Sequence, residues 1–234
     1  MPADDKRRQK KLERRNAKRK QRHREITKHR NLGLAERLRA ATAYPILDCL
    51  ISNTLIEDGI CTAILSRQLP TGEVAYSVFL VDRYCLGVKD AFGGVRFRDE
   101  YRQMVEKSDE KLDMKRIDPA DLRYLVEQSV EYARDLGLEP HSDYARFSAI
   151  FGDIDPEQAS LQVEFGKDGK PLFYAGPHDD SHKCQRIIET LRESCGDDGF
   201  DYVLPVAVLD GNPLFSASSK GLHVYGPPES DEEP

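Results

Sequence analysis

The first strongly hydrophobic stretch of the chain begins after residue 43. Its apolar residues recur at helical spacing and Gly59 provides a stop signal, so the pattern predicts a helix over residues 44–58. The apolar positions are Ile46, Leu47, Leu50, Ile51 and Leu55.

Two runs of β-forming residues follow and flank Pro70-Thr71-Gly72, which predicts a hairpin over residues 60–82. The second run, 73–82, is apolar on both faces, as expected of a central strand. The highly charged segment 98–111 predicts an exposed helix or loop.

The clearest helical pattern covers residues 119–136. Asp118 is a suitable N-cap, Pro119 fits the first helical position and Gly137 provides the stop. One stripe of residues is expected to be buried: Leu122, Leu125, Val126, Ser129, Val130 and Ala133.

The remaining pattern is mixed. A short helix is expected after Ser142, a second hairpin over 160–176 with its turn at 167–170, and a helix from Asp180 or Ser181 to Cys195. Residues 201–209 and 214–226 read as late strands. Because hairpins and helices come in blocks, we expect an α+β fold with a largely antiparallel sheet built from two hairpins with packed helices.

Charge divides the chain into unlike parts. The whole chain carries a formal net charge of -6, yet residues 1–40 hold 16 Lys or Arg against 5 Asp or Glu, so they carry +11 and the rest carries -17. We therefore expect a basic, helical or disordered arm over 1–42 and an α+β core over 43–226. The core has a possible division into 43–117 and 118–226, and an acidic disordered tail follows at 227–234.

The arm is dense enough in cations to bind a polyanion. Roughly 6–10 phosphate contacts are enough for salt-sensitive, non-specific binding, and residues 6–24 contain 12 Lys or Arg. The predicted nucleic-acid contacts are Lys6, Arg7, Arg8, Lys10, Lys11, Arg14, Arg15, Lys18, Arg19, Lys20, Arg22 and Arg24. Aromatic residues are scarce there, which favours recognition of the backbone or of shape over base stacking. The alternative is a solvated charge run.

A second candidate lies where the apolar strand 73–82 ends. Polar residues follow it directly, and the ends of central strands often carry sites. The possible ligand or partner contacts are Asp82, Arg83, Tyr84, Lys89 and Asp90. The alternative is that ion pairs among them support a bend in the chain.

Catalytic signatures are absent from the sequence. It contains no phosphate-loop, dinucleotide-binding, zinc-protease or nucleophile-elbow motif, and no cofactor is predicted. The only metal candidates are His178 with His182, one turn apart, and Asp153 with Asp155 on one side of an extended segment. For both pairs, helix capping and turn formation are the favoured interpretation.

Three phrases of the core carry a resemblance. The stretches "VFLVDRYCLGVKDAFGG", "YARDLGLEPHSDYARF" and "EFGKDGKPLFYAGP" resemble an uncharacterised family of bacterial proteins with a "VD-x-YCLGVKD" phrase. The resemblance covers about residues 45–205. It implies a bacterial cytoplasmic origin and a basic arm attached to the core as a module, and it supplies no catalytic residues.

Localisation and function follow from these patterns. Five scattered cysteines without a C-x-x-C pair, no apolar segment of a secretory signal and no long apolar stretch predict a soluble cytoplasmic protein without a membrane partner. The leading hypothesis is a non-enzymatic protein that binds structured RNA or the ribosome through its arm, with a possible protein partner for the acidic core. The alternatives are a metal-dependent hydrolase of nucleic acid, using Asp82 or the metal candidates, and a protein-interaction adaptor with a solubilising basic arm.

Overall fold

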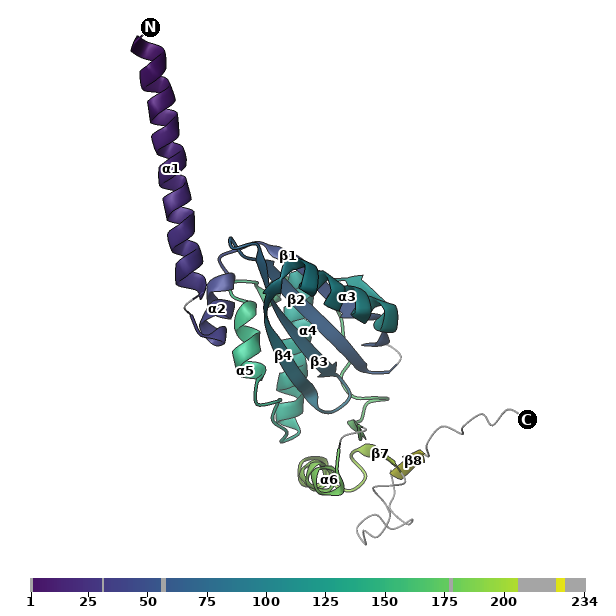
Figure 1. The fold of residues 1–234 in the computed structure, drawn as a ribbon. Coiled ribbons are helices and arrows are strands. Elements are labelled where there is room, and N and C mark those ends of the chain that lie inside the picture. Colours follow the sequence, from purple (N-terminus) through teal and green to yellow (C-terminus); the bar gives the residue numbers. More distant parts are fainter. Residues whose placement is uncertain (1, 31, 56–57, 177–178, 206–221, 226–234) are drawn as a thin grey trace, which may run out of the picture.

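The computed structural model describes residues 2–30, 32–55, 58–176, 179–205 and 222–225. Helix α1 (Pro2–Arg30) projects as a single rod, and α2 (Leu34–Ala41) lies at its base (Figure 1). The fold is α+β, as the sequence predicts.

A five-stranded antiparallel sheet forms the larger part of the fold. Its strands are β1 (Ile46–Ser52), β2 (Ile60–Gln68), β3 (Glu73–Asp82), β4 (Gly87–Phe97) and β5 (Met114–Arg116), in the order β4-β3-β2-β1-β5. The predicted hairpin over 60–82 is confirmed as β2 and β3. The predicted central position of 73–82 is also confirmed, because β3 has a neighbour on each side.

The predicted helix over 44–58 is wrong. Ile46–Ser52 is β1, which pairs with β2 and β5, and the short 3-10 helix η1 (Asn53–Leu55) follows it. Both faces of this strand are covered, so apolar residues occur on both, and over seven residues such a run also matches helical spacing.

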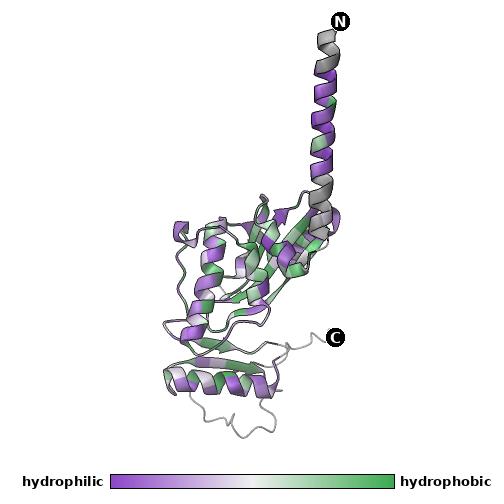
Figure 2. Ribbon diagram, turned by 90° about the vertical axis from the view of Figure 1, so that its left-hand side faces the viewer, coloured by the Kyte–Doolittle hydropathy of each residue, from purple (hydrophilic) through white to green (hydrophobic). Residues whose placement is uncertain are grey.

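Helices cover the two faces of this sheet (Figure 1). On one face, α3 (Arg98–Leu112) packs Tyr101 against residues such as Ile64 and Tyr76. On the other face lie α2, α4 (Pro119–Asp135), α5 (Tyr144–Phe147) and the 3-10 helix η2 (Ser148–Ile150), around a core that includes Phe79. Much of the ribbon of these strands has the green colour of hydrophobic residues in Figure 2.

The sequence signals for α4 are confirmed in detail. The Asp118 side chain accepts a hydrogen bond from the Ala120 N–H, Pro119 begins the helix, and Gly137 adopts a φ of 78° just beyond its end. All six residues of the predicted stripe are buried. Residues of α4 such as Leu122 and Leu125 pack in the same hydrophobic cluster as the large sheet.

A smaller parallel sheet lies beside the hairpin tip of β3 and β4. It consists of β6 (Leu172–Tyr174), β7 (Asp201–Pro205) and β8 (Leu222–Tyr225), and α6 (Ser181–Cys195) packs on it. The 3-10 helix η3 (Pro156–Gln158) lies in the preceding connection. The Asp180 side chain caps α6, as the sequence predicts, and Cys184 is buried.

The predicted second hairpin is wrong. The turn at 167–170 is present, with the Lys167 N–H bonded to the Lys170 carbonyl at 2.7 Å. However, residues 159–165 form no strand, and β6 pairs in parallel with β7. The predicted strand at 201–209 is seen over 201–205 and that at 214–226 over 222–225, while the rest of both segments and the tail 227–234 lie outside the described residues.

Candidate functional site

Helix α1 presents its cations to solvent. Every side chain from residue 7 to residue 21 is exposed, and at 1.5 Å per residue the helix is about 43 Å long. Nine of the 12 predicted contacts lie in this interval, while the side chains of Lys6, Arg22 and Arg24 lie outside the described part.

These cations are arranged on one side of the helix. At 100° per residue, eight of the nine lie within half of the circumference. We call this set the cationic face: Arg7, Arg8, Lys10, Lys11, Arg14, Arg15, Lys18 and Arg19. The ninth, Lys20, lies on the opposite side with Gln9, Glu13 and Asn16. A one-sided row of cations can contact a single phosphate backbone along the length of the helix.

The predicted contacts at the end of β3 have separate roles. Asp82 is buried, and its Oδ1 accepts hydrogen bonds from the Tyr84 and Cys85 N–H groups at 2.9 and 3.1 Å. Burial raises the pKa of Asp82 to about 6, although the Lys89 charge and backbone N–H groups, including that of Leu86, oppose the rise. Asp82 therefore shapes the turn between β3 and β4.

Arg83 and Tyr84 join the large sheet to the segment that precedes β6. The Arg83 guanidinium donates to the carbonyls of Leu55 and Glu164 and lies over the Tyr84 ring. The Arg83 carbonyl accepts a hydrogen bond from the Gly166 N–H at 3.0 Å, and the Tyr84 carbonyl accepts one from the Leu172 N–H at 3.1 Å. Both residues thus support the bend that follows β3.

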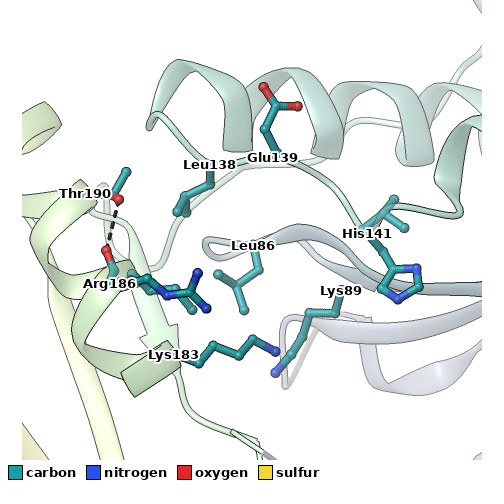
Figure 3. A pocket seen from close by; sticks show the side chains of 10 residues that line it. Leu86, Lys89, Leu138, Glu139, His141, Lys183, Arg186 and Thr190 are labelled. Atoms are coloured by element: carbon teal, nitrogen blue, oxygen red, sulfur yellow. Dashed lines mark hydrogen bonds between the residues drawn. The ribbon is translucent and has the colours of Figure 1, made fainter. Parts of the chain in front are cut away.

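Lys89 instead reaches a cavity between the two sheets. The cavity has a volume of about 380 Å³ and lies between the start of β4, the loop after α4, and α6 (Figure 3). Its apolar wall consists of Leu86, Val88, Leu138 and Ile187. Asp90 is adjacent, with its Oδ1 3.8 Å from His141 Nε2, and His141 also lines the cavity.

Charged side chains from three parts of the chain line the same cavity. They are Lys89 from β4, Glu139 and His141 from the loop after α4, and Lys183 and Arg186 from α6. Sequence reasoning missed Glu139, Lys183 and Arg186. Lys183, Arg186, Ile187 and Thr190 do share one face of α6, but no local pattern indicates what that face meets.

Asp179 holds two of these lysines together. Its carboxylate lies 2.6 Å from Lys183 Nζ and 3.9 Å from Lys89 Nζ, and it accepts a hydrogen bond from the Gly176 N–H at 2.7 Å. Burial alone would raise the pKa of Asp179, but these contacts outweigh burial and lower it. Asp179 is therefore ionised, and it neutralises one of the two lysines.

The metal candidates do not converge in the described part of the chain, where no three His, Cys, Asp or Glu side chains form a group suited to a metal ion. Asp155 caps η3 through the Glu157 N–H, and the charge of Asp153 acts on the buried Arg67. His182 is exposed on α6, and His178 lies outside the described residues.

None of the helices in the described residues combines the length and apolar character that a membrane crossing requires. Comparison of the chain with protein-family models, with curated proteins and with solved structures found no match.

Proposed function

We propose that this chain is a non-enzymatic nucleic-acid-associated protein that binds structured RNA, including the RNA of the ribosome, through α1. The observation that carries the proposal is the cationic face: eight exposed Lys or Arg side chains on one half of a continuous helix. Arginine supplies five of the eight, and its planar fork suits phosphate oxygens.

The composition of α1 also indicates the mode of binding. The helix contains no Phe, Tyr or Trp, so base stacking has no platform. Among its described side chains, Leu12 is the one large apolar group that is exposed. Contacts to phosphates along a helical RNA backbone are the mode that these side chains support. The acidic remainder of the chain repels non-specific phosphate contact and leaves binding to α1.

Deletion of residues 1–30 tests the proposal. In co-sedimentation with ribosomes and in titrations with double-stranded RNA, we expect the full chain to bind with an affinity that falls steeply between 50 and 200 mM salt. The deleted chain should not bind. Unchanged binding after the deletion would exclude α1 as the interface.

A matched pair of variants tests the one-sided arrangement. Lys18→Gln removes a cation from the cationic face, and Lys20→Gln removes the same residue type from the opposite side. We expect Lys18→Gln to reduce the slope of log affinity against log salt by about 0.7–0.9. Lys20→Gln should leave the slope unchanged, and equal effects of the two variants would argue for a diffuse charge run.

A cleavage assay tests the hydrolase alternative. If the purified protein cleaves RNA and a metal chelator abolishes the cleavage, that alternative is favoured instead.

A further inference from the structure

The cavity between the two sheets has an excess of cations that the described residues do not neutralise. Three cations line it, Lys89, Lys183 and Arg186. Asp179 contacts both lysines, and the charge of Lys89 also acts on the buried Asp82. The Arg186 guanidinium makes no hydrogen bond or ion pair with any described residue. Among the residues that the structure describes, the positive charge of Arg186 therefore has no counter-charge.

The other charged groups around the cavity have partners of their own. Glu139 lies 3.6 Å from Arg134 and is largely exposed, and His141 lies beside Asp90. In Figure 3 the Glu139 carboxylate points away from the two lysines. Glu139, His141 and Asp90 therefore do not neutralise Arg186.

The side chains converge in a way that suits a ligand. In Figure 3 the Arg186 guanidinium points from α6 toward Leu86, and the amino groups of Lys89 and Lys183 approach each other from opposite walls. Leu86, Val88 and Ile187 provide an apolar surface next to these cations. The volume of about 380 Å³ falls in the range of roughly 300–1,000 Å³ of small-molecule sites, which combine apolar walls with a few polar groups.

We propose that this cavity binds a small organic anion, with a phosphate or carboxylate group held by Arg186 and Lys89 and an apolar body placed against Leu86, Val88 and Ile187. The ligand bridges β4 and α6, so it contacts the large sheet and the helix of the small sheet together. The site is separate from α1, and the inference does not rest on the function proposed above.

Phenyl phosphate is a suitable probe, because it joins an anionic group to an apolar ring. In calorimetric titration of the full chain at 150 mM salt, we expect saturable binding of one equivalent. Inorganic phosphate, which lacks the apolar body, should bind at least tenfold more weakly. Benzoate binding relative to phenyl phosphate tells whether the site prefers a carboxylate or a phosphate.

Two arginines of α6 provide the matched variants. Arg186→Ala should weaken phenyl phosphate binding about tenfold or more, because it removes charge-assisted hydrogen bonds. Arg192→Ala, whose guanidinium pairs with Asp197 at 2.8 Å outside the cavity, should leave the affinity unchanged. Both variants should keep the thermal unfolding midpoint of the parent chain, since both side chains are on the surface of α6.

Three results would overturn the proposal. They are no saturable binding of either phenyl phosphate or benzoate, equal losses in the two arginine variants, and equal affinities for phenyl phosphate and inorganic phosphate. Deletion of residues 1–30 should leave phenyl phosphate binding intact, so failure here and failure of the RNA-binding proposal are distinguishable.

Discussion

Arg67 on β2 is a buried arginine whose partners are all backbone carbonyls. Its side chain donates to the carbonyls of Ile150 and Phe151 at 3.0 Å and to those of Thr42 and Tyr44 at 3.1 and 3.0 Å. Burial lowers its pKa, and the charge of Asp153 opposes that shift. One guanidinium thereby joins the end of α2 and the segment around η2 to the large sheet.

We expect Arg67→Met to destabilise the fold by about 3 kcal/mol or more, because four carbonyls lose a charged donor in a buried setting. Arg67→Lys should recover only part of the loss, since one ammonium group cannot reproduce the planar fork. Urea unfolding measures both effects. The stability of the exposed control Arg102→Met should stay within about 0.5 kcal/mol of the parent chain. If Arg67→Met and Arg102→Met lost the same stability, Arg67 would not join these segments to the sheet.

Asp82 makes stability depend on pH. Its pKa is raised from 3.8 to about 6 in the folded chain, so the folded state binds this proton more tightly than the unfolded state does. This tighter proton binding adds roughly 3 kcal/mol to the free energy of unfolding. The added stability is fully present below pH 4 and is lost as the pH rises through 6. In Asp82→Asn this loss is absent.

The free energy of unfolding of Asp82→Asn, relative to the parent chain, should therefore increase by up to about 3 kcal/mol between pH 4 and pH 7. The difference between the two proteins is the quantity to measure, because other carboxyl groups titrate in both. A difference that stays constant from pH 4 to pH 7 would show that Asp82 titrates at its ordinary value.

At the scale of elements, the contact between β4 and α4 depends on a glycine. Gly87 begins β4 with a φ of +64°, and a Cβ there would lie 2.6 Å from the Ser129 carbonyl oxygen and 2.9 Å from the Ala133 Cβ. The absence of a side chain thus lets the strand approach α4 closely, next to the wall of the cavity.

Gly87→Ala should cost about 2–4 kcal/mol, from the left-handed backbone and the steric overlap together. Gly72→Ala is the matched control, because Gly72 also has a positive φ, +88°, but nothing lies within 4 Å of the added Cβ. It should cost only about 1–2 kcal/mol. Chemical denaturation of both variants measures the difference, and equal losses would show that packing against α4 adds nothing.

The same scale shows what the sequence can predict. Helix α4 is predictable because Asp118, Pro119, Gly137 and one buried stripe all give the same answer locally. Strand β1 is not, because its partners are Ala63–Arg67 and Met114–Arg116, and only pairing tells a short doubly buried run from a helix. The strand β6 likewise depends on a partner about 30 residues away, so a good local turn at 167–170 suggested the wrong pairing.

The two candidate sites differ in the same way. The cations of α1 lie close together in one stretch of the chain, so the sequence alone indicates them. The cavity combines Lys89, His141 and Arg186 from three separate stretches, and of these only Lys89 was among the predicted site residues. A site that tertiary contacts assemble has no local signature unless its residues form a recognised motif.

For the whole molecule, the boundary between the basic helix and the core is sharper than the charge pattern suggests. The described side chains of α1 are exposed, whereas Leu38 and Ala41 of α2 are completely buried in the main hydrophobic cluster. Residues 34–41 therefore belong to the core, although their charge led us to place them in the arm.

Two deletions locate this boundary. Removal of residues 1–30 should leave the thermal midpoint of the core unchanged, because it takes away no residue of the hydrophobic clusters. Removal of residues 1–42 should destabilise the core by about 3 kcal/mol or more, since Leu38 and the Thr42 carbonyl that pairs with Arg67 are lost.

The thermal midpoint of the 1–30 deletion decides how its RNA binding is interpreted. A fall in this midpoint would mean that α1 supports the fold, and loss of RNA binding in that variant would no longer identify α1 as the interface. An unchanged midpoint, together with lost RNA binding, would assign binding to α1 and leave the core free for a separate ligand.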